Sequence, residues 1–266
     1  MIAIIDQLGK NIFLEEYPKR IISLVPSQTE LLFDLGLSHE VAGITKFCVH
    51  PRQWFEQKPR VGGTKTVKME IVHSLQPDLI IANKEENTKE QIEKLTTRYP
   101  VWISDVNDLE TALQMIISVG KITNKYPQAT EIANKIKNDF TSFALQLKTT
   151  NDKPRVAYLI WKDPYMAVGG DTFIHSMLEA CGFKNVFEHF HRYPTVSITE
   201  LQNASCQWIL LSSEPYPFSQ KIMEALQVQL PGTKIILVDG EMFSWYGSRL
   251  VHAVSYLQKL VTDSMK

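Results

Sequence analysis

Residues 70–81, EIVHSLQPDLII, have a counterpart 130 residues further along the chain in residues 200–211, ELQNASCQWILL. Each stretch contains a glutamate, a short helical pattern and an apolar strand pattern in the same register. A repeat of this kind indicates two similar lobes, each built from alternating strands and helices. Two lobes leave a cleft between them, and small ligands usually bind in clefts between domains. The alternative is that two solvated glutamates begin two unrelated short helices.

The segment upstream of the first repeat predicts a tight strand-turn-helix unit. Residues 20–36 read RIISLVPSQTELLFDLG. A buried strand pattern comes first, the Pro26-Ser27 pair interrupts it, and an apolar helix follows. Ser27 and Glu30 have the spacing of a capping box, and Gly36 suits the left-handed residue that ends a helix.

Strand and helix patterns alternate along the rest of the chain. Strands are expected at residues 41–44, 79–82, 101–103, 155–161, 208–211 and 235–238. Helices are expected at residues 88–95, 171–181 with Asp171 as the cap and Gly182 as the stop, 220–226, and from about 247. After Pro127, apolar residues recur at helical spacing as far as Leu147, which predicts a helix roughly 30 Å long. A helix of that length indicates a stiff connector.

These patterns predict an α/β fold with two Rossmann-like lobes, each a parallel sheet flanked by helices. One long rigid α-helix joins the lobes, and the ligand cleft lies between them. The chain has 266 residues, which exceeds the usual single-core size of roughly 100–200 residues. We place the N-terminal lobe at residues 1–118, the connecting helix region at 119–150 and the C-terminal lobe at 151–266.

Charge and hydropathy exclude two classes of partner. Lys+Arg number 28 and Asp+Glu number 29, so no net field favours nucleic acid or an anionic membrane. No window approaches the ~20 uninterrupted apolar residues of a membrane-spanning helix. The N-terminus, MIAIID, lacks the basic region and the long apolar run of a secretory signal. The protein is therefore expected to be cytosolic unless a signal lies outside this sequence.

The three cysteines are Cys48, Cys181 and Cys206. Their number is odd and no two have CxxC spacing, which argues against a disulfide framework and a cysteine-rich zinc site. We expect three reduced thiols.

The common signatures of catalysis are absent. The sequence has no GxSxG elbow, no P-loop, no GxGxxG after a strand and no HExxH. The lone pairs Gly62-Gly63 and Gly169-Gly170 are typical of turns, because a phosphate-binding loop needs several glycines before a helix. We therefore assign no catalytic residue and no catalytic cofactor, and expect that the protein is not an enzyme.

Histidines offer only weak candidates for metal ligation. His189 and His191 lie two residues apart, and together with His50, His73 or a carboxylate they could complete a site of three or four ligands. Nothing in the sequence brings these groups together, and two loop histidines are more often solvated. We assign no metal site, and keep His50, His189 and His191 as weak candidates.

Aromatic and polar residues concentrate in predicted loops. They are Phe47, His50, Trp161, Tyr165, Tyr193, Phe243, Trp245 and Tyr246. Aromatic loops suit a large, partly flat ligand, because rings offer contact area with little rotamer entropy to lose. Aromatic residues also fill ordinary cores. In residues 241–249, EMFSWYGSR, charged, aromatic and small residues crowd a connection between a strand and a helix, and this favours a functional loop.

Four segments together resemble the helical-backbone, class III or TroA-like, substrate-binding proteins of ABC importers, closest to the group of cobalamin and ferric-siderophore receptors. They are residues 20–36, residues 75–81 (LQPDLII), the long helix after Pro127, and residues 178–187 (LEACGFKNVF). The resemblance covers nearly the whole chain. It implies two lobes joined by one long helix, and a glutamate on each lobe that docks onto the membrane permease. Glu70 and Glu200 match those two positions.

The resemblance also implies a set of ligand contacts. The matching positions are Phe47, His50, Lys65, Asn83, Tyr165, Gly169, Gly170, Tyr193, Glu241, Phe243, Trp245 and Arg249. Lys65 or Thr64, and Asn83, stand where the cobalamin receptors of this group have tryptophans, while Glu241 and Trp245 replace an aspartate and an arginine. These departures concern the ligand more than the fold.

The leading hypothesis is a substrate-binding protein of an ABC importer that captures a corrinoid or a similar bulky metal chelate. One alternative is a ferric-siderophore, heme or metal-ion receptor of the same fold, and another is a cytosolic enzyme or cofactor-handling protein. The expected ligand is cobalamin or a ferric chelate, and the expected partner is the permease. The protein should be a monomer that meets the membrane only through the permease. The family implies a periplasmic location, with a cytoplasmic one as the alternative.

Overall fold

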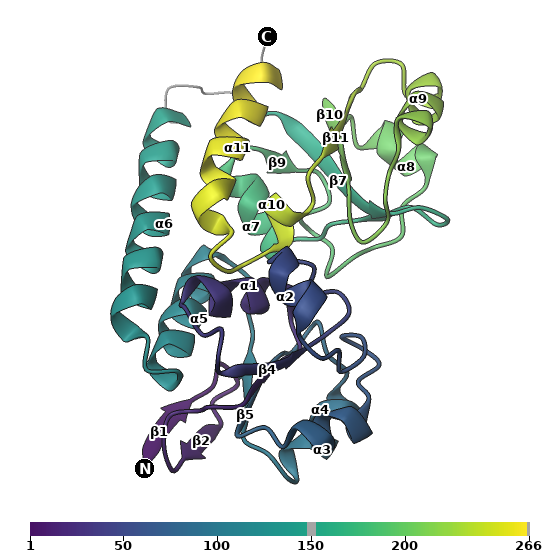
Figure 1. The fold of residues 1–266 in the computed structure, drawn as a ribbon. Helices are drawn as coiled ribbons and strands as arrows, with labels where there is room; N and C mark the ends of the chain where they lie inside the picture. The colour runs from purple at the N-terminus through teal and green to yellow at the C-terminus, as the bar shows by residue number, and fades with distance from the viewer. Residues whose placement is uncertain (148–152, 265–266) are drawn as a thin grey trace. The chain divides into compact units, whose positions relative to one another are not determined.

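The computed structural model describes residues 1–147 and 153–264 and contains alternating strands and helices (Figure 1). In chain order the elements are β1 (Ile2–Ile5), β2 (Asn11–Leu14), β3 (Ile21–Ser23), α1 (Pro26–Asp34), β4 (Val41–Ile44), α2 (Arg52–Gln57), α3 (Met69–Leu75), β5 (Leu79–Asn83), α4 (Lys89–Thr96), β6 (Val101–Ser104), α5 (Leu109–Ile122), α6 (Tyr126–Leu147), β7 (Arg155–Trp161), β8 (Met166–Ala167), α7 (Phe173–Ala180), β9 (Lys184–Asn185), α8 (Ile198–Asn203), β10 (Trp208–Ser212), α9 (Gln220–Gln229), β11 (Lys234–Val238), α10 (Glu241–Ser244) and α11 (Leu250–Ser264).

The chain divides into two compact units. The N-terminal unit contains Met1–Val106, Glu110–Ile136 and Tyr246–Arg249, and the C-terminal unit contains Asn107–Leu109, Lys137–Trp245 and Leu250–Lys266. Helix α6 therefore contributes its first half to one unit and its second half to the other. The lobe limits expected from the sequence stay a prediction.

The two main sheets have the same topology, as the repeat predicts. The N-terminal sheet has the order β4-β3-β5-β6, with every pair parallel. In the C-terminal sheet β9, β7, β10 and β11 pair in the same order, also in parallel, while the short strand β8 adds to β7 in antiparallel. Helices α1, α3 and α4 connect the first set, and α7, α8 and α9 occupy the same places in the second. The predicted α/β fold is confirmed.

An arginine makes the same set of hydrogen bonds at the start of the equivalent strands β3 and β7, and we call this set the arginine latch. In the N-terminal unit, Arg20 donates its backbone N–H to Asp78 Oδ1 at 2.9 Å and accepts the N–H of Asp78 at 3.1 Å, and its Nη2 donates to the carbonyl of Leu75 at the end of α3. In the C-terminal unit, Arg155 donates to Gln207 Oε1 at 2.7 Å and accepts the N–H of Gln207 at 2.8 Å. Its Nη2 donates to the Ala204 carbonyl, at the C-cap of α8, at 2.8 Å.

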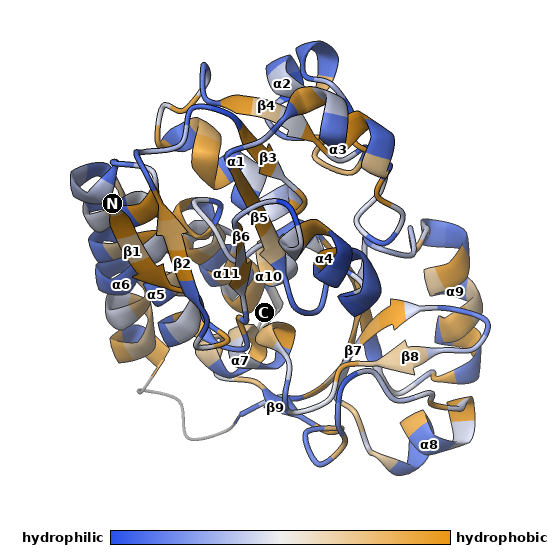
Figure 2. Cartoon of the chain, turned by 90° about the horizontal axis from the view of Figure 1, so that it is seen from below, coloured by the Kyte–Doolittle hydropathy of each residue, from blue (hydrophilic) through white to orange (hydrophobic). Residues whose placement is uncertain are grey.

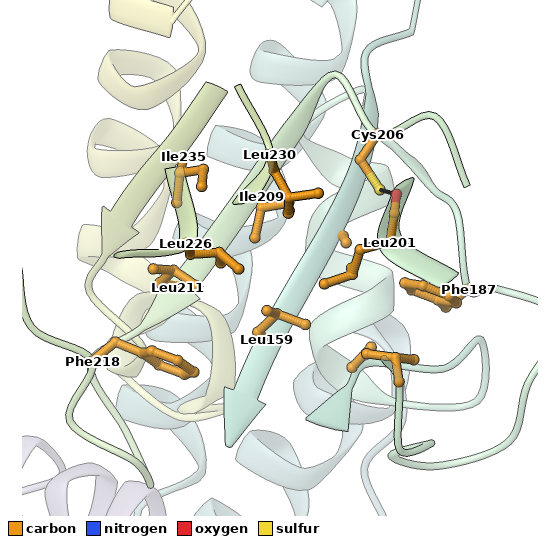
Figure 3. Close-up of a cluster of buried hydrophobic side chains, with 13 residues drawn as sticks. Leu159, Phe187, Leu201, Cys206, Ile209, Leu211, Phe218, Leu226, Leu230 and Ile235 are labelled. Carbon is orange, nitrogen blue, oxygen red and sulfur yellow. Dashed lines mark hydrogen bonds between the residues drawn. The ribbon is translucent and has the colours of Figure 1, made fainter. Parts of the chain in front are cut away.

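Equivalent helices cover one face of each sheet. In the N-terminal unit, α3 and α4 contribute Val72 and Leu95 to one buried cluster with β3, β5 and β6, which Figure 2 shows as hydrophobic strands. In the C-terminal unit, α8 and α9 contribute Leu201 and Leu226 to a cluster with Leu159, Ile209 and Leu211 (Figure 3). Helices as short as α3 and α8 are marginal on their own, so this burial and the latch hold them in place.

The long helix appears where the sequence predicts it. Helix α6 has 22 residues, and Ala129, Ala133, Ile136, Phe140 and Phe143 form its buried stripe. Pro127 lies in its first turn, where its missing N–H has no intrahelical partner to lose.

Two predicted helix caps are wrong. Helix α1 begins at Pro26 with Val25 as N-cap and no side-chain cap bond, so Ser27 and Glu30 form no capping box. Proline at the first helical position starts the helix two residues earlier than a cap at Ser27 would allow. Helix α7 is capped by Thr172, whose side chain accepts from His175 N, while Asp171 accepts the backbone N–H of Arg192.

Both predicted glycine stops have positive φ, +76° at Gly36 and +73° at Gly182.

The hairpin β1–β2, the helix α2 and the helix α5 have no counterpart among the predicted elements. Within the described residues, none of the helices combines the length and the apolar character needed to cross a membrane.

Each cysteine is free and buried. Burial raises the thiol pKa of Cys48 and Cys181, and that of Cys206 to about 11. Thiols with such pKa values stay protonated at neutral pH, so they pack as small apolar side chains.

Candidate functional site

The candidate site residues lie mostly in the loops that follow the carboxyl ends of the parallel strands. In open parallel sheets, ligands usually bind at this edge. We call these loops the carboxyl edge of each unit and describe the two edges separately.

Phe47 is the most exposed aromatic ring on the N-terminal carboxyl edge. It lies in the loop between β4 and α2, is 50% exposed, and has Lys46 Nζ 4.9 Å from its ring centroid. Beneath it, the Thr45 hydroxyl and the Cys48 thiol lie 3.2 Å apart and are buried. His50, which is partly buried, ends this loop. The loop therefore presents a flat ring next to a cation.

The exposed Lys65 and the buried Asn83 belong to two neighbouring loops of the same edge. Asn83 is 2% exposed, and its side chain accepts from Glu85 N at 2.8 Å and donates to Ser104 Oγ at 3.0 Å. Asn87, in the same loop after β5, donates to the Thr64 carbonyl at 2.9 Å and so ties the two loops together. Asn83 thus organises the turn after β5, and its contact with a ligand stays a prediction.

The pair Gly169-Gly170 has a packing role in the C-terminal unit. Gly169 N donates to the Arg192 carbonyl at 2.7 Å, and Gly170 N donates to the Phe190 carbonyl at 2.9 Å. A Cβ on either glycine would collide with the carbonyl oxygens of this segment. The glycines therefore allow two backbones to lie side by side, and they hold the segment that carries Tyr193.

The histidines of the same segment lie on the surface. His189 and His191 are exposed, and His191 Nδ1 lies 3.4 Å from Asp171 Oδ2. Among the residues the structure describes, no three His, Cys, Asp or Glu side chains come together in a way that could hold a metal ion.

Aromatic side chains cluster on the C-terminal carboxyl edge. Trp161, at the end of β7, is 40% exposed and meets Tyr216 edge to face at a centroid distance of 5.5 Å. Tyr216 in turn lies 4.9 Å from Phe218, and Tyr165 packs against the same core. Trp161 is thus a second exposed ring, supported by a row of aromatic neighbours.

The segment 241–245 is more buried than its composition predicts. Phe243 is fully buried, with its ring 5.1 Å from that of Tyr158. Trp245 is 6% exposed, and its Nε1 donates to Glu214 Oε1 at 3.0 Å. Phe243 anchors the segment and Trp245 is tied to its neighbour loop. Direct contact of either residue with a ligand stays a prediction.

Glu214, which sequence reasoning missed, lines a hollow of about 460 Å³ at the carboxyl ends of β10 and β11. The lining residues are Ser213, Glu214, Leu237, Val238, Asp239 and Glu241. Burial raises the pKa of Glu214, bonds from Ser244 and Trp245 lower it, and Glu241 and Asp239 raise it further. The only sequence signal was the strand end at Ser212, followed by a proline-interrupted loop.

Arg249 forms an ion pair within the N-terminal unit. Its Nε and Nη2 donate to the two carboxylate oxygens of Glu30 at 2.8 and 2.6 Å. Both side chains are mostly buried. The pair fixes the segment Tyr246–Arg249 against α1, and contact of Arg249 with a ligand stays a prediction.

The two repeat glutamates begin equivalent helices with different surroundings. Glu70 is the second residue of α3, is exposed, and no described residue hydrogen-bonds its carboxylate. Glu200 is the third residue of α8, and its Oε2 accepts from both the N–H and the hydroxyl of Ser197 at 2.7 Å. The hydroxyl bond and then the backbone bond lower the Glu200 pKa. Both glutamates therefore present negative charge at helix N-termini.

Comparison with known proteins identifies the family. The family model described as "Periplasmic binding protein" matches residues 21–229. A vitamin B12-binding protein of Vibrio parahaemolyticus is 27% identical over 69% of this chain and 66% of its own length. The uncharacterized ABC transporter substrate-binding lipoprotein YvrC of Bacillus subtilis is 27% identical over 69% of this chain and 60% of its own length. The chain thus spans about two thirds of the length of these relatives.

Solved structures share the fold. The periplasmic heme-binding protein RhuT of Roseiflexus sp. RS-1 superposes with a TM-score of 0.80 at 20% identity, covering 94% of this chain and 100% of that one. The periplasmic vitamin B12 binding protein BtuF of Vibrio cholerae gives a TM-score of 0.80 at 20% identity, covering 94% and 99%.

Proposed function

Because the chain belongs to the family of periplasmic binding proteins, we propose that it is the substrate-binding protein of an ABC importer that captures a corrinoid or a metal chelate of similar bulk. The ligand is held at the carboxyl edges of the two units and handed to the permease without chemical change. The predicted cleft between the lobes is part of this proposal.

The observation that carries the proposal is the match to proteins named vitamin B12-binding protein. Two features of the site support it. Phe47 and Trp161, on the two carboxyl edges, expose 50% and 40% of their surface, so a ligand can reach both rings. Exposed rings of this kind suit a large, flat ligand.

A heme or ferric-siderophore receptor is the second candidate. It is supported by the fold shared with a heme-binding protein. At 20% identity that likeness concerns the fold alone, so the corrinoid remains the first choice.

Delivery requires a partner, and we propose that Glu70 and Glu200 dock onto cationic side chains of the permease. Exposed ion pairs contribute only about 0–1 kcal/mol each, which suits a contact that must form and then release. We further propose that the protein acts as a monomer on the outer side of the cytoplasmic membrane and meets that membrane only through the permease.

Isothermal titration of the ligand-free protein with cyanocobalamin tests the ligand. One-site binding at micromolar affinity or tighter is expected. If the titration shows no heat of binding and native mass spectrometry detects no complex, cobalamin is rejected. Heme and ferric chelates then become the leading ligands.

Uptake by cells that lack the chromosomal copy of the gene tests the docking. The double variant Glu70→Ala, Glu200→Ala should lose most of the uptake and keep its affinity for the ligand. Glu90→Ala is the matched control, because Glu90 is also an exposed second residue of a helix in the N-terminal unit. Equal uptake by the double variant and the control would reject the docking role.

A further inference from the structure

The hollow on the C-terminal carboxyl edge has an acidic lining. Three of its six lining residues are the acids Glu214, Asp239 and Glu241, and the other three are Ser213, Leu237 and Val238. No lysine, arginine or histidine belongs to this described lining. A ligand group that enters the hollow therefore meets carboxylate oxygens, one hydroxyl and apolar carbon.

Hydrogen bonds around the hollow fix the turn after β11 and the side chain of Asp239. Gly240 N donates to Ser213 Oγ at 2.9 Å, and Glu241 N donates to Asp239 Oδ1 at 3.0 Å. The backbone N–H groups at the turn after β11 are thus satisfied from inside the protein. They add no donors for an anionic ligand.

Glu214 links the wall of the hollow to the segment behind it. Its Oε1 accepts from Ser244 Oγ at 2.6 Å and from Trp245 Nε1 at 3.0 Å. Both bonds converge on the same oxygen, and the side chain is only partly exposed. The carboxylate is therefore held in one orientation, which a charge-selecting group requires.

The chemistry of such a wall discriminates among chelates of similar size. A carboxylate placed in the hollow would be repelled by the three acids, and the Ser213 hydroxyl is the one donor side chain that the described lining offers it. An amide N–H or an ammonium group would gain a charge-assisted hydrogen bond. Corrinoids carry a periphery of amides, whereas heme carries two carboxylates.

We propose that this acid-lined hollow makes the protein selective for metal chelates whose periphery bears N–H donors or positive charge, with Glu214 as the specificity-determining residue. The proposal rests on the proposed function and names its ligand class. It also assigns Glu214 a positioning role, because the same carboxylate holds Trp245 and Ser244.

The test compares the affinities of cyanocobalamin and of hemin by titration at pH 7.5. The wild-type protein should prefer cyanocobalamin. Glu214→Gln keeps the size and the acceptor oxygen but loses the charge, and should reduce the ratio of the two affinities by about tenfold. Glu241→Gln, which removes a second charge from the lining, should reduce the ratio by about threefold.

Glu224→Gln is the matched control, since Glu224 is an exposed acid on α9 of the same unit and lies outside the hollow. It should leave the ratio unchanged. Circular dichroism shows whether each variant is folded. If Glu214→Gln does not fold, Glu241→Gln still tests whether the charge of the hollow sets the ratio.

The outcomes separate this inference from the transport function. If the wild-type protein binds a chelate but the ratio is the same in the wild type and both hollow variants, the charge selection is overturned and the transport role stands. If the wild type prefers hemin, the selection is likewise overturned. If the wild type binds neither chelate, the proposed function fails, and the selectivity built on it fails too.

Discussion

The ion pair between Arg249 and Glu30 should contribute far more to stability than an exposed pair of the same geometry. Its two hydrogen bonds measure 2.8 and 2.6 Å, and the side chains are 12% and 16% exposed. Hydrogen bonds to charged groups contribute about 1.5–3 kcal/mol, and desolvation offsets part of this. We expect a coupling energy of about 2 kcal/mol in a double-mutant cycle with Arg249→Met and Glu30→Gln. Each single change should cost about 3 kcal/mol, because it strands a buried charged partner.

Urea unfolding, followed by tryptophan fluorescence, measures the cycle. The control is the pair between Arg52 and Glu56, which has a similar distance of 2.8 Å but side chains 89% and 57% exposed. Its cycle, made with Arg52→Met and Glu56→Gln, should give a coupling below about 0.5 kcal/mol. Equal coupling energies in the two cycles would refute the argument that burial sets the strength of the pair.

Three further changes test the packing, the capping and the titration. Gly247→Ala would place a Cβ 2.6 Å from a backbone oxygen of α1, so it should destabilise the fold by about 1–3 kcal/mol, whereas Gly232→Ala, which meets open space, should leave the melting temperature unchanged. Ser197→Ala should cost about 1 kcal/mol and raise the Glu200 pKa, and an unchanged pKa in an NMR titration would contradict the capping box. Because burial raises the Glu214 pKa, the wild type loses stability as the pH rises through that pKa. Glu214→Gln should therefore be the more stable protein at pH 7, and this advantage over the wild type should disappear when unfolding is measured below pH 4.

The parallel strands were predictable because each is a short apolar run bounded by turn residues. Residues 79–82 and 208–211 match β5 and β10 to within one residue. The caps were not predictable, because Ser27 competes with Pro26 for the start of the helix, and Glu30 has a partner 219 residues away. A local pattern cannot register a contact made at that distance in the sequence.

The site was predictable as a set of loops and less so as a set of side chains. Phe47 and Trp161 were expected in loops and are exposed. Phe243 and Trp245 were also expected to be loop aromatics, but both are buried. An aromatic side chain next to a strand can point into the core or towards solvent, and the local sequence does not decide between the two. No sequence motif includes Glu214. Its role depends on the hydrogen bonds that Ser244 and Trp245 donate to its carboxylate.

The repeat in the sequence extends to single hydrogen bonds, and it also has a limit. Arg20 and Arg155 make the same bonds at the start of equivalent strands, so the ends of α3 and α8 are fixed in the same way. At the other end of these helices the units differ, because Ser197 holds the carboxylate of Glu200, and α3 has no side-chain cap. The framework is thus repeated, while the two glutamates are not electrostatically equivalent. A permease that binds both would meet one pre-oriented carboxylate, and one that must be oriented during docking.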